Sequence, residues 1–236
     1  DGIVEGGQAW THYWSGKHPA GLLFSAPTAG LGVGLDQAAL MAWAWEGDGH
    51  RLLNQYFQKE LKLDVVGWLT MPMGPEPFGW FKNEFKSVED LRSVKFRSPP
   101  GIPAETFREI GMPVVSMPGG EIVPSAQRGV IDAAEWISPG DDILLGLADV
   151  WKFYYLEGLH QALSVGDVYI NKTWFDKLPA RLQAVVQESM RAMVADQVFM
   201  NVSINSKALK TLVVEKGTQV RTTPDDYVEQ YMKAVP

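Results

Sequence analysis

A single long helical pattern in the last third of the chain constrains the fold more than any other feature. Pro179 opens the pattern, apolar residues recur at helical spacing from Leu182 to Leu212, and Gly217 fits a C-terminal cap. Helices of globular proteins usually run ~8–20 residues, and this pattern is much longer. A chain of 236 residues forms one large domain or two small lobes. A helix of this length is therefore expected to cross from one lobe to another.

Strand and helix patterns alternate through the rest of the chain. Strands are expected at 63–69, 94–97, 114–115, 130–137, 150–155, 168–170 and 220–222. Helices are expected at 36–59, with a break at Gly47–Gly49, and at 103–110, 121–128 and 224–235. The segment 72–80 is expected to be irregular because it holds three prolines. The alternation indicates an α/β architecture.

Composition and charge exclude several functional classes. Hydrophobic residues make up 46% of the chain and charged residues 21%, as in soluble globular domains. The net charge of −7 argues against a nucleic-acid binder, which would be basic. The sequence has no Cys, which excludes thiol catalysis and disulfide frameworks. The chain opens at Asp1 without Met or a signal peptide, so we expect that it is a fragment or has lost an N-terminal segment.

The sequence carries no motif for covalent catalysis. The G-x-S-x-G, H-E-x-x-H and Walker A patterns are absent, and the four histidines have no metal-ligand spacing. Asp141 and Asp142 stand at an expected helix start, where capping explains them better than a metal does. Three charged residues are more informative than these.

Arg97 ends a short apolar strand and precedes Pro99-Pro100-Gly101. In an α/β protein the carboxyl ends of strands face the ligand crevice, and the guanidinium fork matches a carboxylate. A surface salt bridge is the alternative reading of this arginine. Glu135 follows a nearly uncharged strand, and Glu76 lies in the proline-rich loop. Two carboxylates with backbone carbonyls describe a hard-cation site, although each glutamate alone also fits solvent exposure.

Several segments, spread in order over nearly the whole chain, match one known family. They are His12–Ala20 (HYWSGKHPA), Gly79–Glu84 (GWFKNE), Ser87–Arg92 (SVEDLR), Lys95–Pro99 (KFRSP), Pro118–Ile122 (PGGEI), Gly129–Trp136 (GVIDAAEW), Tyr154-Tyr155, Asn171-Lys172 and Leu178-Pro179. On these segments the chain resembles the extracytoplasmic solute-binding proteins of TRAP transporters. The resemblance is to the branch that binds 2-oxo and 2-hydroxy acids, such as pyruvate and lactate.

The resemblance implies a two-lobed periplasmic receptor with a ligand cleft between α/β lobes. Lobe I is then expected to comprise 1–70 and 160–200, with its N-terminal part missing, and lobe II to comprise 71–159 and 201–236. Such receptors are monomers or homodimers, are not enzymes, and deliver a small organic acid to a sodium-driven membrane permease. Family members also begin with a strand–helix–strand unit and carry further C-terminal helices, so a truncated chain is expected.

The resemblance also implies roles for single residues. Arg97 matches the arginine that clamps the ligand carboxylate, and Trp14 and Gln161 are expected to line the cleft. The bound cation, calcium or sodium, is expected on Glu76, Glu135 and the backbone carbonyl of Trp136. Glu76 stands where the branch usually has Gln, and Gln161 stands where many members have Glu. The added charge at Glu76 favours calcium over sodium.

Two further points stay open at the level of sequence. The family's PFGL segment is altered at 27–31 (PTAGL), which leaves the shape of one cavity wall undetermined. A cation-assisted lyase or isomerase is the alternative function, with His160 beside Gln161 as its acid–base candidate. A module that binds partners through exposed aromatic residues is a third reading.

Overall fold

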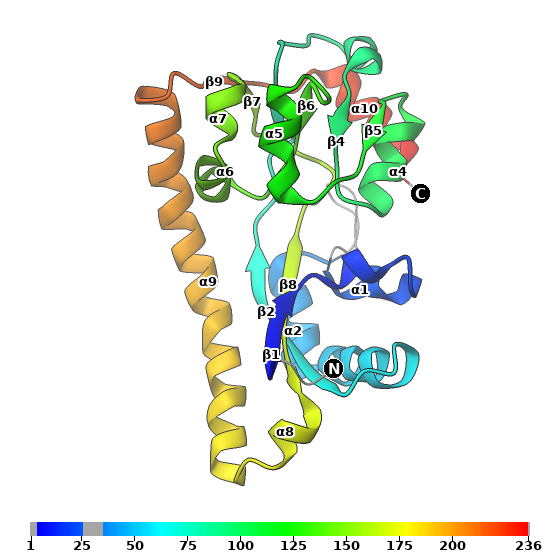
Figure 1. The fold of residues 1–236 in the computed structure, drawn as a ribbon, viewed down its shortest axis with the longest axis vertical. Helices are drawn as coiled ribbons and strands as arrows, with labels where there is room; N and C mark the ends of the chain where they lie inside the picture. The colour runs from blue at the N-terminus through cyan, green and yellow to red at the C-terminus, as the bar shows by residue number, and fades with distance from the viewer. Residues whose placement is uncertain (1–3, 26–34, 236) are drawn as a thin grey trace. The chain divides into compact units, whose positions relative to one another are not determined.

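The computed structural model describes residues 4–25 and 35–235. Its chain divides into two compact units (Figure 1). Within the described residues, unit 1 comprises 4–25, 35–74 and 163–200, and unit 2 comprises 75–162 and 201–235. The division expected from sequence differs at two places, because 71–74 belong to unit 1 and 160–162 belong to unit 2. The second difference places His160 and Gln161 in the same unit as Glu76.

Unit 1 is built on three antiparallel strands in the order β1-β8-β2. These are β1 (Gly6–Ala9), β8 (Ser164–Asn171) and β2 (Val65–Met73). The helices of this unit are η1 (Thr11–Trp14), η2 (Pro19–Gly21), α1 (Leu22–Ser25), α2 (Gln37–Glu46), α3 (Gly49–Gln55), the π-helical turn η3 (Tyr56–Glu60) and α8 (Lys172–Asp176). Leu53, Phe57 and Val165 are fully buried at the centre of its core. The expected break at Gly47–Gly49 is confirmed, since α2 ends at Glu46 and α3 begins at Gly49.

The proline-rich segment is more regular than its sequence indicates. Strand β2 continues through Pro72 to Met73, and Pro72 pairs with Val165 of β8. The register shifts between Leu69 and Met71, which marks a bulge before the proline. Strand β2 also lies at an edge of its sheet, where proline is tolerated because alternate backbone nitrogens face away from the partner strand. The expectation of irregular structure throughout 72–80 was wrong for this reason, and Gly79–Phe81 forms strand β3.

Unit 2 contains a mixed sheet in the order β5-β4-β6-β3-β7-β9. Its strands are β5 (Val114–Val115), β4 (Phe96–Arg97), β6 (Ala133–Ala134), β3, β7 (Phe153–Tyr155) and β9 (Gln219–Arg221). Only β3 runs antiparallel to its neighbours β6 and β7. The helices are η4 (Glu89–Ser93), α4 (Ile102–Glu109), η5 (Gly119–Glu121), α5 (Ile122–Gln127), α6 (Pro139–Leu145), α7 (Leu147–Val150) and α10 (Asp225–Ala234).

Aromatic side chains form most of the core of unit 2. Phe78 packs against Phe107 and Tyr227 in one cluster, at ring distances of 5.8 and 4.5 Å. Trp80 stacks on Tyr154 at 4.1 Å in a second cluster. The Trp80–Tyr154 stack joins the short strands β3 and β7, and the Phe78 group packs the loop before β3 against α4 and α10, so aromatic packing supports a sheet made of two- and three-residue strands. The ends of β4 and β6 are positions from which the site is built.

The long helix expected from sequence is confirmed as α9 (Ala180–Val214), which contains 35 residues (Figure 1). Its residues up to Met200 belong to unit 1 and those from Asn201 belong to unit 2. Among the described residues, no helix, α9 included, is both long enough and apolar enough to span a membrane. The altered segment 27–31 lies outside the described residues.

Candidate ligand and cation site

Four segments of unit 2 bring titratable side chains together. Arg97 is the last residue of β4, and Glu135 follows Ala134 of the adjacent parallel strand β6. Glu76 lies in the loop between β2 and β3, and His160 lies in the loop between β7 and β8. Each of these four residues is at most 3% exposed, so the structure contradicts the readings of Arg97 as a surface salt bridge and of the glutamates as solvated. The sequence only indicated that these residues converge. The structure brings Arg97, Glu76 and Glu135 together in one buried site.

Arg97 is held by three groups. Its Nε and Nη2 both donate to the backbone oxygen of Met117, at 3.1 and 2.9 Å. Its Nη1 donates to the carboxylate of Glu135 and has a long contact of 3.5 Å to the backbone oxygen of the same residue. The guanidinium also lies 5.4 Å from the ring centre of Trp136. Since a guanidinium carries five N–H bonds, one on Nη2 and the weakly held one on Nη1 are available to a ligand carboxylate.

Backbone contacts between two loops place Glu76. The Glu76 N–H donates to the backbone oxygen of Gln161 over 3.0 Å. At Gly158, an added Cβ would lie only 2.0 Å from the Glu76 backbone oxygen, so only glycine allows this approach. Burial raises the pKa of Glu76 to about 8, against a side-chain hydrogen bond with Gln161 that lowers it. The conformation of Glu76 therefore depends on the loop that carries His160 and Gln161.

The two carboxylates lack sufficient positive charge around them. Burial raises the pKa of Glu135 to about 8 as well, against the attraction of Arg97 and with a further rise from the nearby Glu76. One guanidinium faces two buried glutamates, and Oε2 of Glu76 has no hydrogen-bond partner within 4–25 and 35–235. A buried carboxylate in this situation takes up a proton or binds a cation. The residues therefore fit a cation, and a cation would replace the proton.

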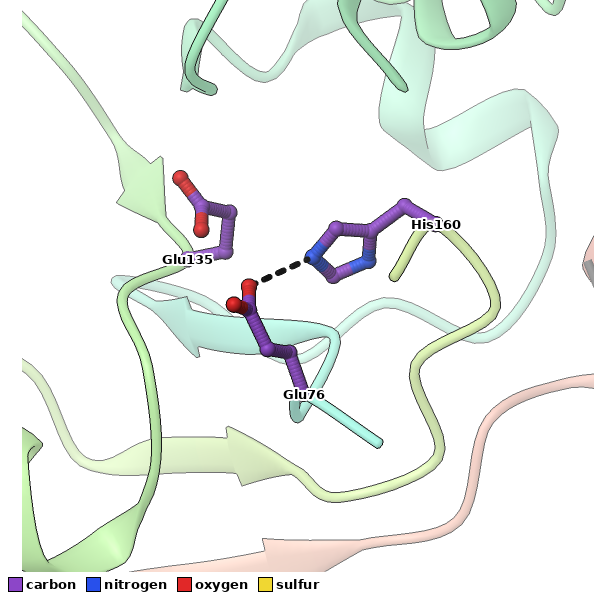
Figure 2. A group of neighbouring side chains, drawn as sticks. All are labelled: Glu76, Glu135 and His160. Atoms are coloured by element: carbon purple, nitrogen blue, oxygen red, sulfur yellow. Dashed lines mark ion pairs between the residues drawn. The ribbon is translucent and has the colours of Figure 1, made fainter. Parts of the chain in front are cut away.

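His160 is the third member of the group (Figure 2). Its imidazole is fully buried, packs at 5.4 Å on the ring of Phe107, and places Nε2 3.6 Å from Oε2 of Glu76. Burial lowers the pKa of His160 to about 4, so the ring is neutral at pH 7. Ligand atoms of Glu76, Glu135 and His160 all lie within 4.8 Å of one another. In the described part of the chain this is the one group of three such residues that is placed to hold a metal ion.

Asp142 is a further buried acid, and the sequence did not identify its role correctly. It lies in the first turn of α6, as expected, but its carboxylate is 1% exposed and bonds to strands rather than capping the helix. Oδ2 accepts from Nε1 of Trp80 at 2.8 Å and from the hydroxyl of Tyr154 at 2.7 Å. Oδ1 accepts from the N–H of Ile137 at 3.2 Å. Asp142 thus ties β3 and β7 to the peptide bond that carries the Trp136 carbonyl.

The remaining expected site residues differ in their placement. Gln161 is buried, and its backbone oxygen accepts from the Glu76 N–H, while its expected place in a ligand cleft stays a prediction. Trp136 is half-buried, packs under the Arg97 guanidinium, and lies so close to Gly119 that a Cβ there would be 2.2 Å from its ring. Trp14 belongs to unit 1, where its ring contacts Phe57 and Tyr169. Its part in ligand binding stays a prediction.

A family model describing bacterial extracellular solute-binding proteins of family 7 matches residues 1–236. A curated relative, the monocarboxylate 2-oxoacid-binding periplasmic protein of Nostoc sp. strain PCC 7120, is 33% identical over 221 residues. That match covers 93% of this chain and 58% of the relative, so the chain spans little more than half of the relative's length.

Three solved structures share the fold and more than a quarter of the sequence. A TRAP transporter solute-binding protein from Bordetella bronchiseptica RB50, a dimer with copurified calcium and picolinate, is 29% identical with a TM-score of 0.86. Two further TRAP periplasmic solute-binding proteins are each 26% identical with TM-scores of 0.85. One, from Pseudoalteromonas atlantica T6c, holds sodium and pyruvate, and the other, from Colwellia psychrerythraea, holds calcium and pyruvate.

Each of these three matches covers 99% of this chain. In the order given, the matches cover 67%, 68% and 69% of the solved chains. Their folds agree with the α/β architecture and the long helix α9 described above. Because the family model matches from the first residue to the last, the chain belongs to the bacterial extracellular solute-binding proteins of family 7, the solute receptors of TRAP transporters.

Proposed function

We propose that this chain forms the acid-binding part of a periplasmic receptor for a small 2-oxo or 2-hydroxy monocarboxylate. The receptor passes this acid to the TRAP membrane permease. The observation that carries the proposal is the buried group of Arg97, Glu135 and Glu76. In this group a positively charged guanidinium and two carboxyl groups meet away from water. The curated relative and the two pyruvate-bound structures support the class of ligand.

Each residue of the group has a separate task in this proposal. Arg97 offers its free N–H groups to the ligand carboxylate, while Met117 and Glu135 hold the guanidinium in place. Glu76, Glu135 and the Trp136 carbonyl hold the cation, and Gln161 orients Glu76. When bound, the cation supplies positive charge to the 2-oxygen and the carboxylate of the acid.

The charges of the site favour a divalent ion. Two glutamates and a monocarboxylate bring three negative charges, and Arg97 supplies one positive charge. A divalent ion such as calcium makes the group neutral, whereas sodium leaves one buried negative charge uncompensated, which is costly in a low-dielectric interior. With glutamine at position 76, sodium would be sufficient. We therefore propose calcium rather than sodium for the chain as it stands.

A receptor is a better description than a lyase or isomerase. The acid–base candidate of the enzyme hypothesis, His160, has its pKa lowered to about 4 by burial, which makes it a weak base and leaves it unprotonated at pH 7. Membership of a solute-binding family supports the same conclusion.

A thermal-shift screen tests the proposed function. The chain is mixed with pyruvate, lactate, longer 2-oxo acids and the matching unsubstituted acids, each with calcium, with sodium or after chelation. A ligand that binds only the native state at one hundred times its Kd stabilises it by ~2.7 kcal/mol. We expect a shift with 2-oxo or 2-hydroxy acids in the presence of calcium. No shift with any acid under any ionic condition, from a sample that unfolds cooperatively, would contradict the proposal.

A further inference from the structure

We propose that the imidazole of His160 is an additional ligand of the cation, so that the site binds divalent ions such as zinc or cobalt(II) more tightly than calcium. This inference rests on the proposed function, because it takes the site of Glu76 and Glu135 as a cation site. It adds a nitrogen donor to a set that otherwise offers only oxygen.

The side chains already have the spacing that one ion requires. Figure 2 shows the Glu76 carboxylate directed at Nε2 of His160, with Glu135 beside them. The Glu76–His160 pair is 3.6 Å apart, and ligand atoms of all three residues lie within 4.8 Å. Bonds of about 2.0–2.4 Å from one ion to each donor put two donors up to about 4–5 Å apart. The three side chains can therefore share one ion without a rearrangement of the backbone.

The nitrogen atoms of His160 lack other partners. Neither Nδ1 nor Nε2 has a hydrogen bond within the described ranges, although the ring is 0% exposed. A neutral imidazole has one N–H and one lone pair, and a buried polar atom without a partner costs stability. An ion next to Glu76 would satisfy the lone pair of Nε2, with the proton on Nδ1.

The backbone determines where this imidazole lies. The hydrogen bond from Glu76 N to Gln161 O, at 3.0 Å, joins the two loops next to His160. Two residues earlier, Gly158 allows the loop to approach Glu76. The ring itself packs against Phe107, with the ring centres 5.4 Å apart. The two backbone contacts of the loop and the packing of the ring on Phe107 therefore position the imidazole beside the carboxylates.

The chemistry of the donors determines which ion gains. Calcium and sodium prefer oxygen ligands and derive little from a nitrogen donor. Zinc binds imidazole and carboxylate together, and cobalt(II) binds similar ligand sets with a visible spectrum. A site of two carboxylates and one imidazole should therefore select zinc over calcium, which a site of oxygen donors alone would not do.

The test compares the metal-stripped parent chain with His160→Gln and with the matched control His50→Gln. His50 is a buried histidine of unit 1 whose pKa is also lowered to about 4, and its Nε2 accepts from Leu69 N. Zinc and calcium affinities are measured by calorimetry at pH 7.5 without acid. We expect His160→Gln to weaken zinc binding about tenfold or more and calcium binding less than threefold. The control should change neither affinity by more than threefold.

Equal zinc affinity in the parent and in folded His160→Gln protein would overturn the inference. If His160→Gln does not fold, imidazole ¹⁵N NMR of the parent gives the answer. We expect zinc to shift the signal of one ring nitrogen of His160, and an unshifted His160 spectrum at saturating zinc would also overturn it. Calcium-dependent acid binding in the parent together with either negative result would leave the proposed function standing. Absence of binding of every ion and acid would instead contradict both.

Discussion

Arg97 donates from Nη1 to the carboxylate of Glu135, and the two side chains are 2% and 1% exposed. From sequence, Arg97 was either a ligand anchor or half of a salt bridge. The structure establishes the salt bridge but places it in the interior, beside Glu76, and leaves N–H groups of Arg97 for a ligand. Removal of one partner from such a pair leaves a buried charge, which typically costs ~3–5 kcal/mol.

Arg97→Ala should abolish acid binding and also destabilise the chain. Loss of the buried, hydrogen-bonded charge pair with the ligand is expected to cost about 2–5 kcal/mol of binding free energy. Arg97→Lys should weaken binding too, because an ammonium does not reproduce the guanidinium fork. The double variant Arg97→Ala/Glu135→Gln separates the two effects, since it removes the orphaned carboxylate. It should regain stability in urea denaturation but not acid binding. If Arg97→Ala binds the best acid within threefold of the parent, Arg97 is not the anchor.

Asp142→Asn should destabilise unit 2 although the two side chains have nearly the same shape. The carboxylate accepts from three donors, on Trp80, Tyr154 and Ile137, through both of its oxygens. An asparagine replaces one oxygen by an NH₂ group, so at least one buried donor faces another donor. We expect a loss of about 1–3 kcal/mol in urea denaturation. Asp141→Asn, which changes the neighbouring acid, is the control and should cost less. Equal stability of Asp142→Asn and parent would show that this hydrogen-bond network is not needed.

Asp167 should make the stability of the chain fall with rising pH. This residue of β8 is 1% exposed in unit 1, and burial raises its pKa to about 7, against weaker effects of backbone N–H groups. In the unfolded chain the pKa is near its ordinary value of about 4. The folded state therefore holds a proton that the unfolded state releases between these values. The stability that this group supplies is complete below pH ~4 and is lost as the pH rises to ~7.

Asp167→Asn isolates this effect from the other buried acids. The variant keeps the size of the side chain and cannot ionise, so it should exceed the parent by only ~1 kcal/mol near pH 5, one unit above the pKa in the unfolded chain. Near pH 8 it should exceed the parent by ~2–4 kcal/mol. The free energy of unfolding of both proteins is measured by urea denaturation from pH 5 to 8. A difference that does not grow with pH would mean that Asp167 is already ionised, or already paired, in the folded state.

Patterns along the chain predicted the elements that depend on local periodicity. Helix α9 follows from the apolar spacing after Pro179, and the break between α2 and α3 follows from Gly47–Gly49. The strand predicted at 130–137 is only Ala133–Ala134 in the structure, because strand length depends on the partner strands and not on propensity alone. Pro72 lies within β2 because the bulge and the sheet edge accommodate it, and neither is visible in the sequence.

The site was predictable only in part. Arg97, Glu76 and Glu135 stood out because charged residues at strand ends and in stiff loops are unusual, and the family resemblance connected them. His160 was noted only as a possible acid–base group, and Asp142 only as a helix cap. Their actual contacts, with Glu76 and with Trp80 and Tyr154, join segments far apart in the chain. Local sequence carries no signal for such pairs, although the adjacent Gln161 pointed to the region of His160.

Calorimetric titration of the parent and of Glu76→Gln, each with calcium, with sodium and with neither ion, tests the central claim most directly. The claim is that Glu76 and Glu135 hold a cation against the bound acid, and that the charge of Glu76 makes this ion divalent. The parent should bind the acid tightly with calcium, weakly with sodium and least after chelation. Glu76→Gln should keep acid binding but shift its preference from calcium towards sodium, because it removes one negative charge from the neutral set. Equal acid affinities in all six samples would contradict the account, because neither the ion nor the charge of Glu76 would then take part in binding.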